Sequence, residues 1–268
     1  MVRLALMLLF LAAFAVPHLP AKAEECRITF AVSNDFPPFQ FKDVYGKWHG
    51  IAVELAQKMV SAAGCQIEIL DLPWQRALDM LKKGELQMLP LITANPYRES
   101  FMHFIGPMGM EQIVFVAQSQ LAQSINKPDD LKTFPGLIGK TKGTEYAEKI
   151  EKLINDPSVR ERVVDNVSDA NKIEMLLIER IGGAFEERAV AQYYFHNDIL
   201  DPEEHEICLT FLPNPVYFGL SEQSTSTDIL VRLRDAWRTM LAEEDVSLIY
   251  DKYGITMPDL TQLDFPQY

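Results

Sequence analysis

The sequence predicts an α/β fold of two lobes, each containing a mostly parallel sheet flanked by helices. Strand and helix signals alternate along the chain, as they do where helices connect parallel strands. The chain also changes character twice, becoming polar after Gln118 and turning before the apolar run 216–221. We therefore expect residues 24–117 and 214–268 to form lobe 1, with lobe 2, residues 118–213, inserted into it.

The individual elements follow from the spacing of apolar residues. Short apolar runs between turn signals predict strands. These runs are Ile28–Val32, Ile67–Leu70, Leu86–Ile92, Ile113–Ala117, Leu137–Gly139, Gly183–Phe185 and Val216–Ser221. Apolar residues that recur every three or four positions predict helices. These segments are Ile51–Ala63, Trp74–Leu81, Glu145–Ile154, Asp169–Glu179, Ala189–Tyr194, Ile229–Ala242 and Val246–Tyr253.

The first 23 residues have the pattern of an export signal. Arg3 gives a positive start, Leu4–Val16 is almost entirely apolar, and Ala21-Lys22-Ala23 supplies the small residues that a signal peptidase recognises. The apolar run is shorter than the roughly 20 residues that a membrane-spanning helix needs. We expect a signal peptide at residues 1–23 and a mature protein outside the cytoplasm, with a retained membrane anchor as the competing interpretation.

The composition of the remaining chain excludes some classes of function. Without the signal peptide, about 245 residues would remain, with 23 basic and 38 acidic side chains and a formal charge of −15. This charge repels a phosphate backbone, so we do not expect nucleic acid as a partner. The sequence contains neither a Walker-type glycine loop nor a cysteine–histidine spacing typical of metal sites. We therefore expect no cofactor, no metal and no ATP hydrolysis by this chain.

Two of the three cysteines occupy equivalent positions. Cys26 precedes the strand Ile28–Val32, and Cys65 precedes the strand Ile67–Leu70. If these are neighbouring parallel strands, both sulfur atoms lie at the same edge of the sheet, and an oxidising compartment favours their pairing. We expect a Cys26–Cys65 disulfide, with Cys208 left as a buried small apolar residue.

Four short motifs then follow one another along the chain. They are Phe36–Phe39 with Gly46–Gly50, Thr93–Arg98 with Phe104–Met108, Gly139–Thr144, and Arg180–Glu187. Their order and spacing cover essentially the whole mature chain. The chain resembles the periplasmic solute-binding proteins of polar amino-acid ABC transporters, family 3 of the type II periplasmic binding proteins, whose motifs read PPF with GxxxG, TxTPxR with FSxPY, GxxxGT, and R-[IV]-DAxxxD.

This resemblance implies a fold and a function. The fold would be the two-lobe type II periplasmic binding protein fold with a ligand cleft between the lobes. The protein would be a monomer in the periplasm that captures an amino acid or a related small carboxylate. The closed form would deliver this ligand to an inner-membrane ABC permease, and capture would work by a shift of population from the open to the closed form.

Three residues are candidates for binding the ligand's carboxylate. A planar guanidinium donates two parallel hydrogen bonds to one carboxylate, so Arg98 is the predicted clamp. Its alternative is a solvated arginine at a helix start. Thr93 would add a hydroxyl or backbone donor, or else cap the following turn. Thr144 would contribute the start of a helix in lobe 2, where free N–H groups favour an anion, or simply cap that helix.

The opposite charge of a zwitterionic ligand needs an acidic partner. Glu187 stands where the family usually has the aspartate that holds the ligand's amino group, and we expect it to take this role. Glu186 is its rival, and a solvated acidic helix start is the alternative for both. Gly182 replaces another aspartate that is usual in the family. Both departures weaken the assignment to an ordinary α-amino acid.

Aromatic residues are candidates for the ligand's side chain. Phe36 and Trp74 would offer ring faces, which pack on apolar groups and attract cations, although most aromatic residues belong to the core. Phe36 follows the end of a strand, where ligands of α/β proteins lie. Arg76 would add charge to the cleft or face solvent.

Two other classes of function use the same fold. One is a ligand-sensing partner of a membrane receptor. The other is a dehydratase that acts on cyclohexadienyl substrates, in which Glu187 or Glu186 would serve as general acid or base. We expect a binding protein and not an enzyme.

Overall fold

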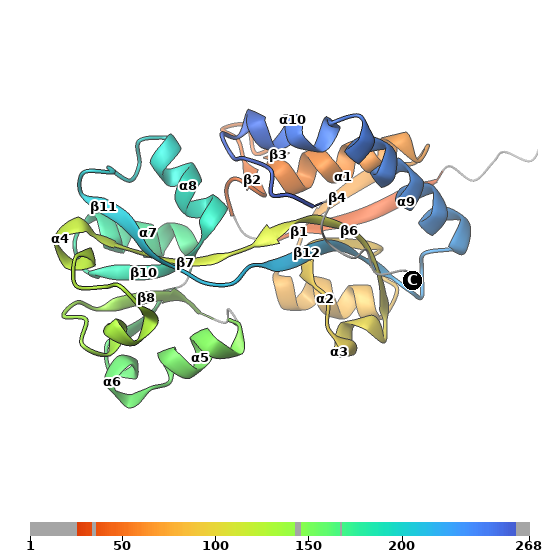
Figure 1. Cartoon of the computed structure of the whole chain (residues 1–268). Helices are drawn as coiled ribbons and strands as arrows, with labels where there is room; N and C mark the ends of the chain where they lie inside the picture. The colour runs from red at the N-terminus through yellow and green to blue at the C-terminus, as the bar shows by residue number, and fades with distance from the viewer. Residues whose placement is uncertain (1–25, 34–35, 143–145, 167, 261–268) are drawn as a thin grey trace, which may run out of the picture.

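The computed structural model describes residues 26–33, 36–142, 146–166 and 168–260, so the predicted signal peptide lies outside the described residues. These residues form two lobes that are joined in the middle of the molecule (Figure 1). Among them, no helix has the length and apolar character needed to cross a membrane. They also contain no group of three or more His, Cys, Asp or Glu side chains placed to hold a metal ion.

Each lobe is built on a five-stranded sheet of the described residues, with strand orders β4-β1-β5-β12-β6 and β11-β7-β10-β8-β9. The strands are β1 (Arg27–Val32), β4 (Gln66–Asp71), β5 (Met88–Thr93), β6 (Met102–Glu111), β7 (Ile113–Gln118), β8 (Ile138–Thr141), β9 (Val163–Asn166), β10 (Gly183–Glu187), β11 (His205–Thr210) and β12 (Asn214–Ser221), with a separate hairpin of β2 (Phe41–Lys42) and β3 (Trp48–His49). Parallel pairing joins β4, β1 and β5 in lobe 1 and β10, β8 and β9 in lobe 2. The reversed strands are β12 and β7, which enter their sheets from the other lobe.

Helices cover both faces of both sheets (Figure 1). They are α1 (Ile51–Ala62), α2 (Trp74–Lys82), α3 (Pro96–Glu99), α4 (Ser119–Ala122), the 3-10 helix η1 (Pro128–Lys132), α5 (Glu148–Ile154), α6 (Pro157–Arg160), α7 (Asp169–Leu177), α8 (Arg188–His196), α9 (Thr227–Ala242) and α10 (Asp245–Lys252). The alternation along β7 shows how one strand serves two faces, since Val114 and Val116 pack on one side and Phe115 and Ala117 on the other.

The predicted α/β class and two-lobe architecture are confirmed, and several details differ, among them the unpredicted strands β9 and β11. The strand expected to end lobe 1 pairs with β10 and β11, so the first crossing between the lobes lies at Gln112 and not near residue 118. The longest strand, β6, is absent from the prediction because Gly106, Pro107 and Gly109 interrupt its apolar pattern. The helix expected from Glu145 begins at Glu148.

Contacts behind the crossing strands join the two lobes. One continuous hydrophobic core includes α1, α9 and α10 of lobe 1 together with α7 and α8 of lobe 2. At the surface of this region the ring of Tyr193 on α8 lies 6.2 Å from the ring of Phe41 on β2, which in turn meets Tyr253 edge-on at 6.0 Å. The lobes are therefore packed together on one side of the crossing and separated by a cleft on the other.

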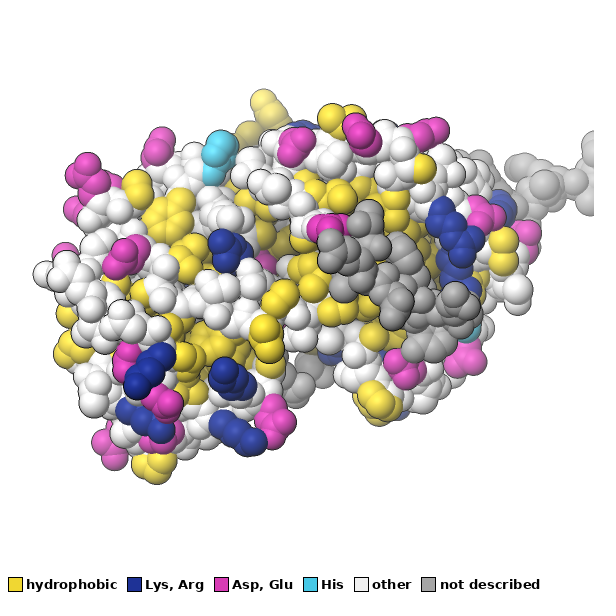
Figure 2. Space-filling view, in the orientation of Figure 1, with side chains coloured by type: hydrophobic (Ala, Val, Ile, Leu, Met, Phe, Trp, Pro, Cys, Tyr) yellow, Lys and Arg dark blue, Asp and Glu magenta, His cyan; other side chains and the backbone are white. Residues whose placement is uncertain are grey.

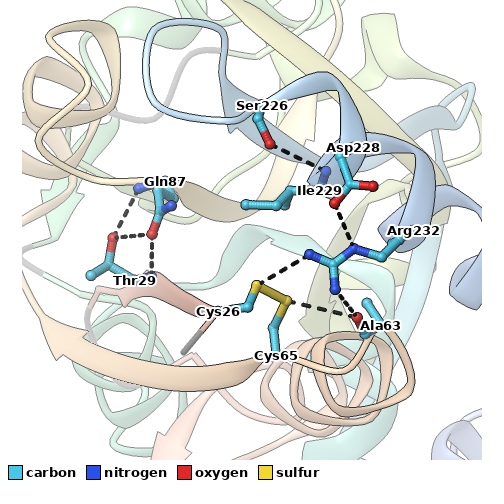
Figure 3. The surroundings of a disulfide bond; sticks show 9 residues. All are labelled: Cys26, Thr29, Ala63, Cys65, Gln87, Ser226, Asp228, Ile229 and Arg232. Atoms are coloured by element: carbon cyan, nitrogen blue, oxygen red, sulfur yellow. Dashed lines mark hydrogen bonds and ion pairs between the residues drawn. A yellow bond between two sulfur atoms is a disulfide. The ribbon is translucent and has the colours of Figure 1, made fainter. Parts of the chain in front are cut away.

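The predicted disulfide is confirmed. Cys26 and Cys65 are bonded, with a Cα–Cα distance of 4.6 Å, because β1 and β4 are neighbouring parallel strands. Figure 3 shows Arg232 of α9 beside the bond, where its guanidinium donates to the carbonyl oxygen of Ala63 at 2.9 Å and to the Cys26 Sγ at 3.7 Å. Cys208 is a free cysteine and is only partly buried.

The disulfide closes a loop with a sequence separation of 39 residues, which limits the freedom of the unfolded chain. A variant carrying Cys26→Ala and Cys65→Ala should lose about 2–4 kcal/mol of unfolding free energy, measured by urea denaturation. Cys208→Ala, which removes a thiol outside the bridge, should lose much less. Equal midpoints for the double variant and the wild type would contradict the prediction.

Candidate functional site

A cleft of about 640 Å³ lies between the lobes. Its wall in lobe 1 comes from the carboxyl ends of β1 and β5 and from α2, and its wall in lobe 2 comes from β8, β10 and α7. A notch between the lobes is visible along the lower edge of the molecule (Figure 2). The residues of the predicted site that line the cleft are Phe36, Trp74, Thr93, Arg98 and Glu187. The predicted Thr144 lies outside the described residues.

Arg98 is fixed at the cleft by its own lobe. Its backbone N–H donates to the side chain of Asn95 at 2.9 Å, which makes Asn95, and not Thr93, the cap of α3. Its guanidinium Nη1 donates to the carbonyl oxygen of Thr93, the last residue of β5, at 2.8 Å. Thr93 therefore orients Arg98 through its backbone, and the guanidinium is partly buried instead of solvated.

The aromatic candidates stand on the same lobe. Phe36 is held in a tight turn by paired backbone hydrogen bonds with Gln40, and its ring stacks on Phe39 at a centroid distance of 5.6 Å. Trp74 is the first residue of α2 and is partly buried. Arg76, two residues later, is exposed and does not line the cleft. Lobe 1 thus offers two aromatic faces next to one guanidinium.

Lobe 2 supplies buried acidic groups. Glu187 ends β10 and caps α8, because its carboxylate accepts the backbone N–H of Val190 at 3.0 Å. The carboxylate of its rival Glu186 forms an ion pair with Lys172 of α7 at 3.2 Å, with both side chains 1% exposed. The Lys172 Nζ also donates to the Thr141 hydroxyl at 3.0 Å. Neither glutamate is the solvated helix start of the alternative interpretation.

Gln112 connects the lobes at the first crossing. Its backbone N–H donates to the Glu187 carboxylate at 3.3 Å, and its carbonyl oxygen accepts the backbone N–H of Arg188 at 2.8 Å. Its side-chain amide donates to the carbonyl oxygen of Phe211, in the second crossing segment, at 3.0 Å. Glu187, the predicted ligand-binding residue, is therefore bonded directly to the first segment that crosses between the lobes, which we call the hinge.

The environment shifts the pKa values of two cleft carboxyls. Burial raises the pKa of Glu187 to about 8, against the opposing effect of its two backbone hydrogen bonds. Burial also raises the pKa of Glu111 at the end of β6, although the charge of Arg98 opposes the shift. Both carboxyls lie where a negative charge is costly unless a cation comes near.

Three residues of the cleft and hinge lie outside the predicted set: Glu111, Gln112 and Lys172. Lys172 carries a usable signal, since it stands four residues before Leu176 on the buried side of α7, and a lysine on such a side needs a partner. Glu111 ends a strand that the apolar pattern does not reveal, and Gln112 follows it, so no comparable signal marks them.

The family of the chain follows from comparison with known proteins. The profile of the bacterial extracellular solute-binding proteins, family 3, matches residues 28–256. The chain therefore belongs to this family and is a solute-binding protein, as its four motifs predicted.

Two curated relatives are similar over much of the chain. The ABC transporter arginine-binding protein 1 of Escherichia coli (strain K12) is 24% identical over 232 residues, which cover 85% of this chain and 90% of that protein. The arginine-binding extracellular protein ArtP of Bacillus subtilis (strain 168) is 23% identical over 177 residues, which cover 64% of this chain and 65% of the relative. The match with ArtP thus spans less than two thirds of that relative's length.

A solved structure shares the fold. An ancestral arginine-binding protein bound to arginine has a TM-score of 0.70 and 20% sequence identity, and the match covers 85% of this chain and 97% of that one. This likeness confirms the type II periplasmic binding protein fold predicted from the sequence.

The raised pKa of Glu187 predicts a pH dependence of stability. Between its ordinary value of 4.5 and about 8 the folded protein holds a proton that the unfolded chain releases, so the Glu187 carboxyl makes the fold less stable as pH rises. We expect the unfolding free energy of Glu187→Gln, relative to wild type, to grow by about 1.4 kcal/mol per pH unit in this window.

Urea denaturation at several pH values measures this difference. Glu206→Gln, which removes one negative charge from an exposed position outside the cleft, is the matched control. Parallel stability curves for wild type and Glu187→Gln would show that the Glu187 carboxyl does not have the raised pKa.

Proposed function

We propose that the cleft captures a small amino acid and that the protein delivers it from the periplasm to an inner-membrane ABC importer. The observation that supports this proposal best is the guanidinium of Arg98, which the Thr93 carbonyl holds at the cleft wall. A guanidinium in this position can donate to a carboxylate in the cleft. Both relatives described above are named as arginine-binding proteins, which agrees with a ligand of this kind.

The two lobes would contribute opposite charges to one ligand. Arg98 of lobe 1 would bind the carboxylate, and Glu187 of lobe 2 would face the ammonium group. Phe36 and Trp74 would cover the ligand's side chain. A ligand that touches both lobes stabilises the closed form more than the open form, and this difference in affinity drives closure.

We further propose that the chain binds its ligand without converting it. Glu186 is tied to Lys172, and Glu187 is tied to the backbone N–H groups of Val190 and Gln112. Such fixed partners suit carboxyl groups that hold a ligand in place, whereas a general acid or base must exchange a proton with its substrate. Thr144 remains a proposed contributor from lobe 2.

A thermal-shift screen of the mature protein against the amino acids tests this function. A ligand at 100 times its dissociation constant adds about 2.7 kcal/mol to the unfolding free energy, which raises the melting temperature by several degrees. Arg98→Ala should weaken binding about 30-fold or more, because it leaves the ligand's carboxylate without its charged partner.

The matched control is Arg76→Ala, which removes an exposed arginine from the same lobe outside the cleft. This variant should bind like the wild type. Failure of the wild-type protein to bind any amino acid, or full affinity in Arg98→Ala at an unchanged apo melting temperature, would refute the proposed function.

A further inference from the structure

Glu111 is a charged residue in the cleft that the proposed function leaves without a role. It is the last residue of β6 and stands immediately before the hinge residue Gln112. Its side chain lines the cleft. Within residues 26–33, 36–142, 146–166 and 168–260, its carboxylate receives no hydrogen bond and has no basic group within 4.0 Å. Glu111 is partly buried at the cleft wall, so its carboxylate is available to a ligand in the cleft.

The other two glutamates of the cleft are different. Glu186 is paired with Lys172, and Glu187 accepts backbone hydrogen bonds from Val190 and Gln112. In the described part of the cleft, Glu111 is thus the one glutamate that no donor satisfies.

The charges around Glu111 indicate what its missing partner is. Arg98 of the same lobe attracts it, and Glu187 of lobe 2 repels it. A cation placed among these groups would neutralise the two carboxylates. A carboxylate bound to Arg98 would lie beside that cation, and the two charges together describe a zwitterion.

We infer that Glu111 binds the ammonium group of the ligand whose carboxylate is held by Arg98, an inference that rests on the proposed function. The ammonium group would then bind Glu111 of lobe 1 and face Glu187 of lobe 2. These two residues belong to the lobes on either side of the hinge. In the empty cleft the attraction between Arg98 and Glu111 partly offsets the cost of burying them. A bound zwitterion would replace that attraction, because its carboxylate would bind Arg98 and its ammonium group would bind Glu111.

This arrangement also selects among small carboxylates. An organic acid without an ammonium group would give nothing to Glu111, and its negative charge would be repelled by Glu111. The cleft is therefore specific for zwitterionic amino acids and discriminates against organic acids that have the same side chain.

The experiment compares pairs of ligands by isothermal titration calorimetry. The probes are the twenty L-amino acids and, for the one that binds most tightly, the α-hydroxy acid with the same side chain. Glu111→Gln should bind the amino acid about 10- to 100-fold more weakly than the wild type does. Its affinity for the hydroxy acid should be unchanged or higher, and Glu111→Asp should recover part of the loss.

Controls separate this role from a structural one. Glu111→Gln should keep or raise the apo melting temperature, since the partly buried carboxylate that it removes accepts no hydrogen bond in the described residues. Glu206→Gln, which lies outside the cleft, should bind like the wild type. Absence of binding by the wild-type protein overturns the proposed function and this inference together. Binding by the wild type that Glu111→Gln leaves intact, or weakens equally for both probes, overturns only the assignment of Glu111.

Discussion

The bond between the Arg98 guanidinium and the Thr93 carbonyl is the interaction on which the organisation of the cleft depends. A free arginine side chain would sample many positions, and ordering it on binding would cost conformational entropy. Because Thr93 ends a buried strand and Asn95 caps the next short helix, the guanidinium is positioned before any ligand arrives. The acidic groups of lobe 2 can bind the opposite charge of the same ligand because this positive charge is fixed in lobe 1.

Much of the fold could be predicted because the signals that define it are local. The run Ile28–Val32 and the helical spacing of 51–63 each identify an element without reference to the rest of the chain. Strand β6 cannot be identified in this way. Gly106-Pro107 is typical of a turn, and only pairing with β12 makes the segment a strand. The first crossing at Gln112 was therefore out of reach, because locating it requires knowing which sheet receives Ile113–Gln118.

The same distinction between local signals and tertiary structure applies to the residues of the candidate site. Arg98 and Glu187 belong to motifs that can be recognised from the spacing of residues in the sequence. Lys172 and Glu111 acquire their positions from tertiary structure, one through a pair with a distant strand and the other through the end of an unpredicted strand. Even for Glu187, the sequence indicated a charge facing the ligand but not the hydrogen bond to Gln112, which exists only because β7 lies beside β10.

That hydrogen bond has an evolutionary consequence. A change at position 187 that adapts the cleft to a new ligand also alters a contact of the segment that joins the lobes. Position 111 is free of this constraint, since its side chain bonds to nothing in the described hinge. Descendants of this protein would therefore diversify in what they recognise most readily through residue 111, while residue 187 would preserve the contact between β10 and the segment that joins the lobes.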